Sequence, residues 1–396
     1  MSLELPVSPR GPYSLALSAR LTSDATRTFR DGVFTALLDV DGRPELARAW
    51  QSPDGTVTLR ADSRAAAERL RWILALDDDH SGFLRSVRDD PLLGRAALEL
   101  RGLRPVRTAT VAHALLRAFC GQLIEAKLAR RTEQRIIRAV CAPGPERLHL
   151  APATRDLAAL APARLRALGL HQSRAASLVR LCRAVELERM HAAPTEAVAQ
   201  RLRRERGIGP WSVGVVCLQG LGRFDAGLVG DLGLVKLMRA LLGRHVETDE
   251  TAALLEPYRE WAGIASVYLI SGFARGLLPV HERRAASLVR LCRAVELERM
   301  HAAPTEAVAQ RLRRERGIGP WSVGVVCLQG LGRLDAGLVG DLGLVKLLRA
   351  LLGRRVETEE TAALLEPYRE WAGIASVYLL GGFARGLLPV HERRAA

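Results

Sequence analysis

The stretch LRRERGIGPWS, residues 202–212, decides the fold, because it holds a helix end, a Gly-x-Gly turn and the start of a second helix. Gly207 and Gly209 permit positive φ angles and a close approach of the backbone to another molecule. A backbone bent in this way points successive N–H groups outward at a helix N-terminus, which suits one nucleic-acid phosphate without reading its sequence. Ile208 is the expected apolar contact between the two helices. An ordinary helix–helix turn has the same pattern, so the turn alone does not establish a function.

A single acidic residue follows this hairpin at a fixed distance. Asp231 lies twenty residues after Trp211, directly before the run LGLVKLMRALL at 232–242, whose apolar residues recur at helical spacing. An aspartate in this position can cap the helix by accepting a backbone N–H. A fixed carboxylate can also stabilise the positive charge that develops on a sugar when a glycosidic bond breaks. Both interpretations stay open, and the two roles can coexist.

The rest of the chain predicts an α+β protein that is mostly α. Residues 1–80 are expected to form an antiparallel β-sheet domain, with strands at Tyr13–Leu21, Phe34–Asp39 and on both sides of Pro53-Asp54-Gly55, and a helix capped by Ser63. Residues 81–283 are expected to form a helical domain. Its apolar residues recur at helical spacing in 111–120, 128–140, 175–187, 195–202, 213–218 and 232–242.

A near-identical repeat occupies the C-terminal part of the chain. The segment 174–283 recurs as 284–393 without an insertion or deletion, so that 284–396 is predicted to be a tandem duplicate of 174–286 and an incomplete domain. Copies this alike indicate either a recent tandem duplication or an assembly error. The six differences are Phe224/Leu334, Met238/Leu348, His245/Arg355, Asp249/Glu359, Ile270/Leu380 and Ser271/Gly381.

The charge of the chain is compatible with a polyanionic partner. Its formal net charge is +15, which fits nucleic-acid binding because basic side chains displace counterions from phosphates. Nearly all of this charge is arginine, since only Lys127, Lys236 and Lys346 are lysines, and a GC-rich genome produces the same bias. The charge alone leaves both explanations open.

Several function classes are not expected. No apolar run is long enough for a membrane helix, and residues 1–12 lack the pattern of a signal peptide, so we expect a cytoplasmic protein without membrane partners. The six cysteines form no CxxC pair and lie near no histidine at zinc-ligand spacing. We therefore expect neither a metal site nor a cofactor.

The motifs taken together resemble a known family. GIGPWS at 207–212 followed by GDLGL at 230–234 resembles the hairpin and catalytic-aspartate signature of the AlkA-type 3-methyladenine DNA glycosylases, which belong to the helix-hairpin-helix (HhH) superfamily. GLRP at 102–105 and FCGQLI at 119–124 resemble the entry to that family's helical domain. The resemblance covers residues 10–286 and implies a sheet domain followed by an HhH glycosylase domain.

The resemblance also implies roles for individual residues. Asp231, with Asp341 as its duplicate, is expected to be the catalytic carboxylate. Leu123 matches the residue that wedges into the gap left by a flipped nucleotide, although core packing is the alternative. The DNA-binding residues are expected to be Gly207, Ile208, Gly209, Ser212 and Leu123, and the base pocket is expected to hold Trp211, Gln122 and Tyr268, with Tyr258 and Trp261 as weaker candidates.

The implied function is monofunctional hydrolysis of the N-glycosidic bond of alkylated purines in base excision repair. Bifunctional relatives carry a lysine nucleophile two positions after the second hairpin glycine, where this chain has Trp211, so no lyase activity is expected. The expected partner is double-stranded DNA containing alkylated bases, in a bacterial cytoplasm at the nucleoid. The alternative is a non-catalytic HhH DNA-binding or damage-sensing protein.

The duplicate supplies only half of a second site. It has its own hairpin at 317–321 and Asp341, but no second copy of Gly121-Gln122-Leu123, so one complete site per chain is expected. Docking the duplicate in place of the first copy would loop out about 110 residues, at a cost of about 4 kcal/mol. We therefore expect the spare half to expose apolar helix faces and to promote self-association.

Overall fold

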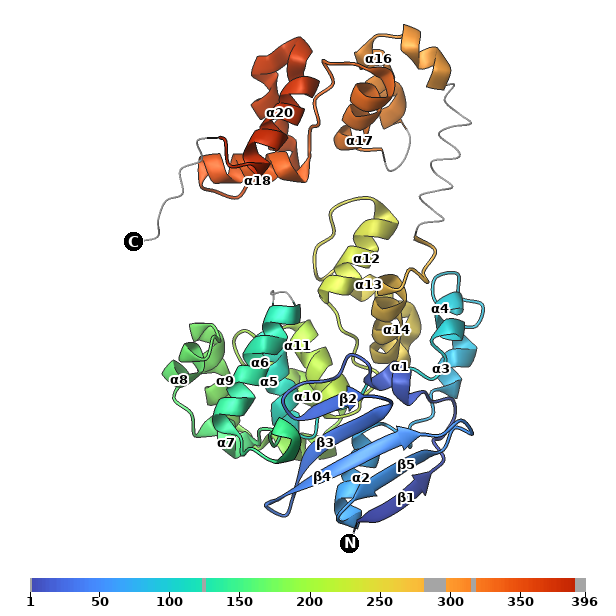
Figure 1. Ribbon diagram of the computed structural model, residues 1–396, viewed down its shortest axis with the longest axis vertical. Coiled ribbons are helices and arrows are strands. Elements are labelled where there is room, and N and C mark those ends of the chain that lie inside the picture. The colour runs from blue at the N-terminus through green and yellow to red at the C-terminus, as the bar shows by residue number, and fades with distance from the viewer. Residues whose placement is uncertain (1, 123–125, 281–296, 315–317, 389–396) are drawn as a thin grey trace. The chain divides into compact units, whose positions relative to one another are not determined.

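The computed structural model describes residues 2–122, 126–280, 297–314 and 318–388 (Figure 1). The chain divides into two compact units, the first of residues 1–241 and 245–279 and the second of residues 242–244 and 280–396. Among the described residues, no helix is both long enough and apolar enough to cross a membrane. The protein is mostly helical and contains one antiparallel sheet, as the sequence predicted.

The sheet opens the first unit. Its five strands lie in the order β1-β5-β4-β3-β2, and every neighbouring pair is antiparallel. The predicted turn at Asp41-Gly42 joins β3 to β4, and both residues have positive φ angles, 51° and 83°, as a tight two-residue hairpin turn requires. The strands are β1 (Leu3–Val7), β2 (Arg27–Arg30), β3 (Val33–Val40), β4 (Arg43–Gln51) and β5 (Val57–Ala61).

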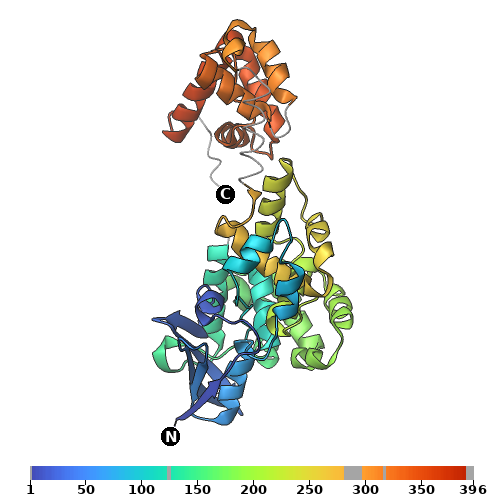
Figure 2. The same ribbon diagram turned by 90° about the vertical axis from the view of Figure 1, so that its right-hand side faces the viewer.

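One helix covers a face of this sheet. Helix α2 (Arg64–Ile73) packs on β3, β4 and β5, beside the strands in Figure 2. It begins where predicted, because the Ser63 hydroxyl accepts the N–H of Ala66 at 3.1 Å. Buried Phe34, Leu59 and Leu70 belong to the apolar core between the helix and the sheet.

The strand predicted at Tyr13–Leu21 is wrong. The structure has a short helix there, α1 (Leu15–Ala19). The Ser14 side chain caps it by accepting the N–H of Leu17, and the Gln51 side chain accepts the N–H of Leu15 at 2.9 Å. Alanine and leucine favour a helix once its first turn is capped, so these local hydrogen bonds outweigh the alternating pattern.

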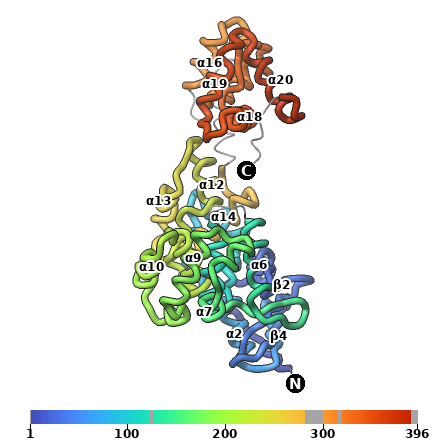
Figure 3. The backbone as a smooth tube through the Cα atoms, turned by 90° about the vertical axis from the view of Figure 1, so that its left-hand side faces the viewer, coloured from blue at the N-terminus to red at the C-terminus, as the bar shows by residue number. Residues whose placement is uncertain are grey.

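A helical region with its own core completes the first unit. Helix α5 lies inside it, because nine of its eleven residues are buried. Helices α7 and α9 pack together, as the tube in Figure 3 shows. The helices are α3 (Ser81–Ser86), α4 (Gly94–Glu99), α5 (Val111–Gly121), α6 (Ala126–Val140), α7 (Thr154–Ala158), α8 (Pro162–Ala167), α9 (Gln172–Ala184), α10 (Thr195–Arg203), α11 (Pro210–Val215), α12 (Leu232–Leu242), α13 (Thr251–Leu255) and α14 (Ala262–Ala274), with short turns η1 (Pro145–Arg147), η2 (Leu187–Ala192), η3 (Val216–Gly220) and η4 (Glu256–Trp261).

The second unit repeats the last helices of the first. Helix α17 corresponds to α11, α18 to α12 and α20 to α14, each at the offset of the sequence repeat. The packing differs, since Tyr268 is 0% exposed whereas its duplicate Tyr378 is 76% exposed. A side chain that is buried in the first copy is thus exposed in the second. The elements are η5 (Leu297–Ala302), α16 (Thr305–Arg313), α17 (Pro320–Val325), η6 (Val326–Gly330), α18 (Leu342–Leu352), η7 (Thr358–Glu360), α19 (Thr361–Leu365), η8 (Glu366–Trp371) and α20 (Ala372–Ala384).

Candidate active site

The Gly-x-Gly turn forms the predicted hairpin between α10 and α11. Gly207 has φ +90°, a conformation that L side chains rarely adopt, and Pro210 starts α11 at the first helical position, where its missing N–H costs no helical hydrogen bond. Ile208 is 7% exposed and belongs to the helical core, as predicted. A Cβ atom added at Gly207 or Gly209 would meet nothing within 4 Å. The backbone of the turn is therefore open to a ligand.

Gln122 fixes the hairpin to the end of α5. Its side-chain nitrogen donates to the carbonyl oxygen of Gly207 at 2.8 Å and to the Ser212 hydroxyl at 2.9 Å. Ser212 is buried beneath the turn. Gln122 and Ser212 therefore hold the hairpin in place, and the amide of Gln122 is bonded to protein in this structure.

Trp211 connects the end of α5 to the aspartate. A Cβ atom on Gly121 would lie 2.5 Å from Cη2 of the indole, so only glycine leaves room for the ring there. The indole N–H donates to Oδ2 of Asp231 at 3.0 Å. The ring is half-buried. Trp211 thus contacts the predicted catalytic carboxylate.

Asp231 is held through both of its oxygens. Oδ1 accepts the N–H of Gly233 at 2.7 Å, at the start of α12, while Oδ2 accepts the indole N–H. Gly230 has φ +88°, and its N–H donates to the Thr251 hydroxyl at 2.7 Å, which fixes the turn before the aspartate. The carboxylate is half-buried. Asp231 therefore caps α12 through Oδ1, and its Oδ2 still contacts Trp211 next to the hairpin.

The aromatic residues predicted near the C-terminal end of the site lie in the core. Tyr268 is fully buried, and its hydroxyl is 3.2 Å from the carbonyl oxygens of Leu100 and of Leu103. Ile270, two residues further along α14, is the residue that faces Gly233. Residues two positions apart in an α-helix point in directions that differ by about 200°. Since Ile270 faces Gly233, Tyr268 points away from Asp231.

Tyr258 is buried and Trp261 is half-buried, and both contact the same part of the first unit as Tyr268. The Tyr258 hydroxyl donates to Asp90 at 3.3 Å, and Trp261 stacks on Phe224 at 6.2 Å between ring centroids. These aromatic residues attach the end of the first unit to the α3–α4 segment, and the structure does not bring them to Asp231. The predicted wedge residue Leu123 lies outside the described residues, directly after Gln122.

A buried ion network had no recognisable signal in the sequence. Arg117 on α5 donates to Asp24 at 2.7 Å and to Glu133 on α6 at 3.0 Å, and the ring of His113 lies 2.8 Å from Glu133. Burial raises the pKa of Asp24, but the charges of Arg27, His113 and Arg117 outweigh it and hold this pKa below its usual value. The potential ligand atoms of Asp24, His113 and Glu133 lie within 4.8 Å of one another, yet Arg117 occupies both carboxylates, so the group is an ion network.

The duplicate repeats the Trp–Asp contact without its surroundings. The Trp321 indole donates to Oδ2 of Asp341 at 3.0 Å, and Oδ1 accepts the N–H of Gly343 at 2.7 Å. Trp321 is 47% exposed. The duplicate has no sequence counterpart of Gly121 and Gln122 that could cover the ring and hold the hairpin.

Comparisons with known proteins agree on one group of enzymes. No model of a known protein family matches the chain. The chain is 26% identical over 282 residues to a protein of Mycobacterium tuberculosis described as a probable bifunctional transcriptional activator/DNA repair enzyme AlkA, with 68% of this chain and 56% of that protein covered. It is 25% identical over 204 residues to the DNA-3-methyladenine glycosylase of Bacillus subtilis, with 49% of this chain and 67% of that protein covered. The chain thus spans little more than half the length of the mycobacterial relative.

Solved structures show the same fold. The 3-methyladenine DNA glycosylase of Archaeoglobus fulgidus superposes with a TM-score of 0.61 at 17% identity, over 68% of this chain and 97% of that one. The 8-oxoguanine glycosylase/lyase of Clostridium acetobutylicum, in complex with double-stranded DNA, gives a TM-score of 0.56 at 14% identity, over 68% and 96%. The chain is therefore similar in sequence to proteins described as AlkA and as DNA-3-methyladenine glycosylase, and it has the fold of these DNA glycosylase structures.

Proposed function

We propose that the protein is a monofunctional DNA glycosylase that hydrolyses the N-glycosidic bond of alkylated purines of the 3-methyladenine type. One observation carries this proposal: the Trp211 indole donates to Asp231 directly beside a hairpin whose backbone is open and held by Gln122. A phosphate-binding turn and a fixed carboxylate are the two groups that this reaction needs. The sequence relatives point to the same chemistry.

Asp231 supplies the negative charge for the reaction. When the bond between the sugar and an alkylated purine breaks, its electron pair moves to the positively charged base, which leaves neutral. Positive charge then develops on the sugar, and a carboxylate held by two hydrogen bonds stabilises it with little reorganisation. Water adds to the anomeric carbon and loses a proton to solvent, and the carboxylate can orient that water.

The hairpin holds the DNA. The space beside Cα of Gly207 and of Gly209 is empty, so a phosphate oxygen can approach the turn without meeting a side chain there. Leu123 follows Gln122 directly, and we propose that it fills the gap left by the flipped nucleotide. The net charge of +15 favours this binding.

Trp211 favours base release without cleavage of the DNA strand. It stands where bifunctional relatives have a lysine, and an indole cannot form a Schiff base with the sugar. Its aromatic face suits a base that carries positive charge, because cations are attracted to the π face of an aromatic ring. We therefore propose that alkylated purines are preferred over neutral oxidised bases.

The proposal is tested with duplex DNA treated with a methylating agent. The protein is expected to release methylated purines and to leave abasic sites, without nicking the strand and without a covalent adduct after borohydride treatment. A borohydride-trapped adduct would contradict the monofunctional mechanism. Salt-sensitive DNA binding without release of any base would contradict catalysis and favour a non-catalytic DNA-binding protein.

A further inference from the structure

Helix α6 carries a row of positive charges on its exposed face. Lys127, Arg130, Arg131, Arg135 and Arg138 are all exposed, whereas the single acidic residue of the helix, Glu133, is buried in the ion network. We call these five residues the α6 cation row. At 100° per residue, they fall within an arc of about 140°. Every charged residue on the exposed face of α6 is therefore a cation.

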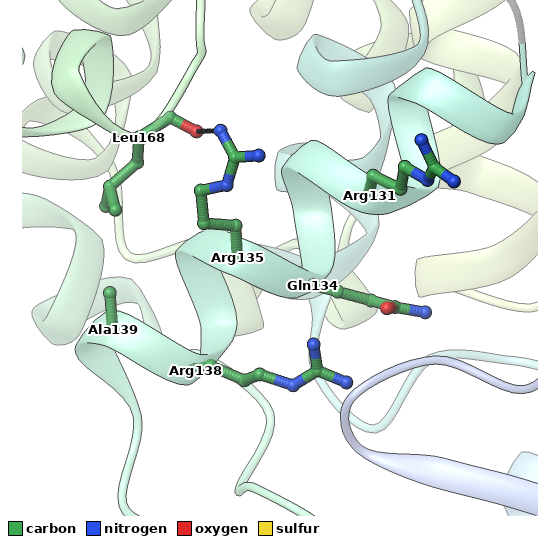
Figure 4. A pocket seen from close by; sticks show the side chains of 6 residues that line it. All are labelled: Arg131, Gln134, Arg135, Arg138, Ala139 and Leu168. Carbon is green, nitrogen blue, oxygen red and sulfur yellow. Dashed lines mark hydrogen bonds between the residues drawn. The ribbon is translucent and has the colours of Figure 1, made fainter.

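The cation row borders two adjoining hollows in the surface. The larger, of about 560 Å³, is lined by Arg131, Gln134, Arg135, Arg138, Ala139 and Leu168, and the smaller, of about 320 Å³, by Ala126, Lys127, Arg130, Arg131 and Gln134. In Figure 4, Arg131, Gln134 and Arg138 extend to the same side of the helix, and Arg135 turns toward the Leu168 carbonyl. Arginine and glutamine side chains can thus converge on a ligand in these hollows.

The described residues do not neutralise the charges of the row. Within the described parts of the chain, none of the five forms an ion pair, and Arg135 makes only a 3.5 Å contact with the Leu168 carbonyl. Other exposed arginines do have acidic partners, for example Arg60 with Glu4 and Arg180 with Glu205. Like charges at i,i+4 destabilise a helix. Repulsion within the row destabilises the isolated helix, and an anionic ligand would relieve this repulsion.

The row begins beside the candidate active site and leads away from it. Helix α6 starts at Ala126, four residues after Gln122, which bonds to Gly207 and Ser212 of the hairpin. From Lys127 to Arg138 the helix rises about 16 Å, and over this length measured along the duplex axis one DNA strand carries about five phosphates. The row therefore starts a few residues after a side chain that holds the hairpin, and it is long enough to meet several phosphates.

We propose that the α6 cation row binds the phosphates of duplex DNA on one side of the lesion, as a second, sequence-independent contact beside the hairpin. This inference rests on the proposed function. The row makes no contact with the base or the sugar that reacts. It is expected to govern affinity and its salt dependence, and to leave the rate of base release from bound DNA unchanged.

The test compares two triple variants of the full-length chain. The row variant is Arg131→Gln with Arg135→Gln and Arg138→Gln. The control variant is Arg85→Gln with Arg88→Gln and Arg101→Gln, which removes three exposed charges from the α3–α4 segment. Binding of fluorescent duplex DNA is measured by anisotropy from about 50 to about 200 mM salt. The negative slope of log K against log salt is expected to become shallower by about 2.7 in the row variant. It is expected to stay unchanged in the control.

The slope predicts a change in affinity that can be measured directly. The ratio of native to row-variant affinity is expected to be about 40-fold larger at about 50 mM than at about 200 mM salt. When the duplex is shortened on one side of the lesion, the native chain and the row variant should bind it with equal affinity. When it is shortened on the other side, the difference in affinity should remain. Glutamine is a good helix former and relieves the repulsion, so the melting temperature of the row variant is expected to equal or exceed the native value.

The outcomes separate the inference from the proposed function. Equal salt slopes for the row and control variants would overturn the inference, even where the native chain releases methylated bases. A reduced slope with single-stranded RNA but not with duplex DNA would overturn it as well. A reduced slope with duplex DNA by a native chain that releases no base would support the contact and contradict the glycosylase proposal.

Discussion

The indole N–H of Trp211 donates to Oδ2 of Asp231 at 3.0 Å, and the duplicate repeats this contact at 3.0 Å between Trp321 and Asp341. The repeated segment therefore suffices to set the distance between the two side chains without the end of α5. The surroundings differ, because Gly121 lies against the ring of Trp211, whereas Trp321 is 47% exposed. The contact is local, but a complete site also needs the end of α5.

The Trp211→Phe variant separates the hydrogen bond from the aromatic face. Phenylalanine keeps a ring beside Gly121 and removes the donor to Asp231. A hydrogen bond to a charged group contributes about 1.5–3 kcal/mol, so loss of its positioning effect is expected to slow single-turnover base release by about 10-fold or more. Trp321→Phe is the matched control and should have no effect. An unchanged rate in Trp211→Phe would show that the indole N–H does not position the carboxylate.

The Gly209→Ala variant tests the phosphate contact of the hairpin. Its φ of −96° is accessible to alanine, and a Cβ atom there meets no protein atom within 4 Å. The melting temperature is therefore expected to stay native, while the methyl group obstructs a phosphate and weakens DNA binding by about 10-fold, as about 1.4 kcal/mol of lost contact does. Gly319→Ala has the same open space in the duplicate and serves as the control. Native affinity in both variants would exclude close approach of DNA at this glycine.

His80 is expected to make the stability of the first unit pH-dependent. Its ring is 1% exposed, neither ring nitrogen has a hydrogen-bond partner, and it contacts Phe224 edge-on at 4.9 Å. Burial, helped by the charges of Arg104 and Arg107, lowers the pKa of His80 from 6.5 to about 3. Because the unfolded state binds the proton first, stability is full above pH 6.5 and is lost as the pH falls toward 3.

The His80→Phe variant removes this titration. Relative to the native chain, its free energy of unfolding is expected to gain about 1.4 kcal/mol for each pH unit below about 6.5, measured by urea unfolding from pH 7 to pH 4. At pH 7 the variant should be as stable as the native chain or more stable, since two buried unbonded nitrogens are removed. Parallel pH profiles for the two proteins would contradict a neutral, buried His80.

The exposed face of the duplicate is expected to cause self-association. Trp371 and Tyr378 are 54% and 76% exposed, whereas Tyr268, the first-copy counterpart of Tyr378, is buried in the first unit. The combined Trp371→Ser and Tyr378→Ser substitution should lower the concentration-dependent sedimentation of the full chain, and a chain ending at Ala286 should behave like the variant. Identical monomeric behaviour of all three proteins would contradict this expectation.

The sequence predicts the elements with strong local signals. Ser63, Asp41-Gly42 and the Gly207–Pro210 turn each fix one boundary through a cap or a required φ angle, and all three occur where expected. The helix at Leu15–Ala19 was missed, because a strand and a short capped helix both fit this alternating stretch, and the distant side chain of Gln51 completes its N-terminal hydrogen bonds.

The sequence predicted only the parts of the site that depend on short spacings along the chain. The approach of Asp231 to Trp211 occurs in both copies of the repeat, whereas the role of Gln122 depends on the packing of α5 against a hairpin that lies far along the chain. The prediction placed Tyr268 in the base pocket, but the sequence does not fix which face of α14 meets the site. Neighbouring residues of a helix point about 100° apart, so an alignment error of one residue changes the face. The ion network joins Asp24 to Glu133, which are distant in the sequence, and it has no spacing pattern at all.

The central claim is tested most directly by single-turnover release of methylated purines with Asp231→Asn and Asp341→Asn side by side. Asparagine caps a helix as well as aspartate does, so both variants should fold and bind DNA. Asp231→Asn is expected to slow release by at least about 100-fold, with Asp341→Asn at the native rate. Native activity in Asp231→Asn, or loss of activity in Asp341→Asn alone, would contradict the assignment of Asp231 as the catalytic carboxylate.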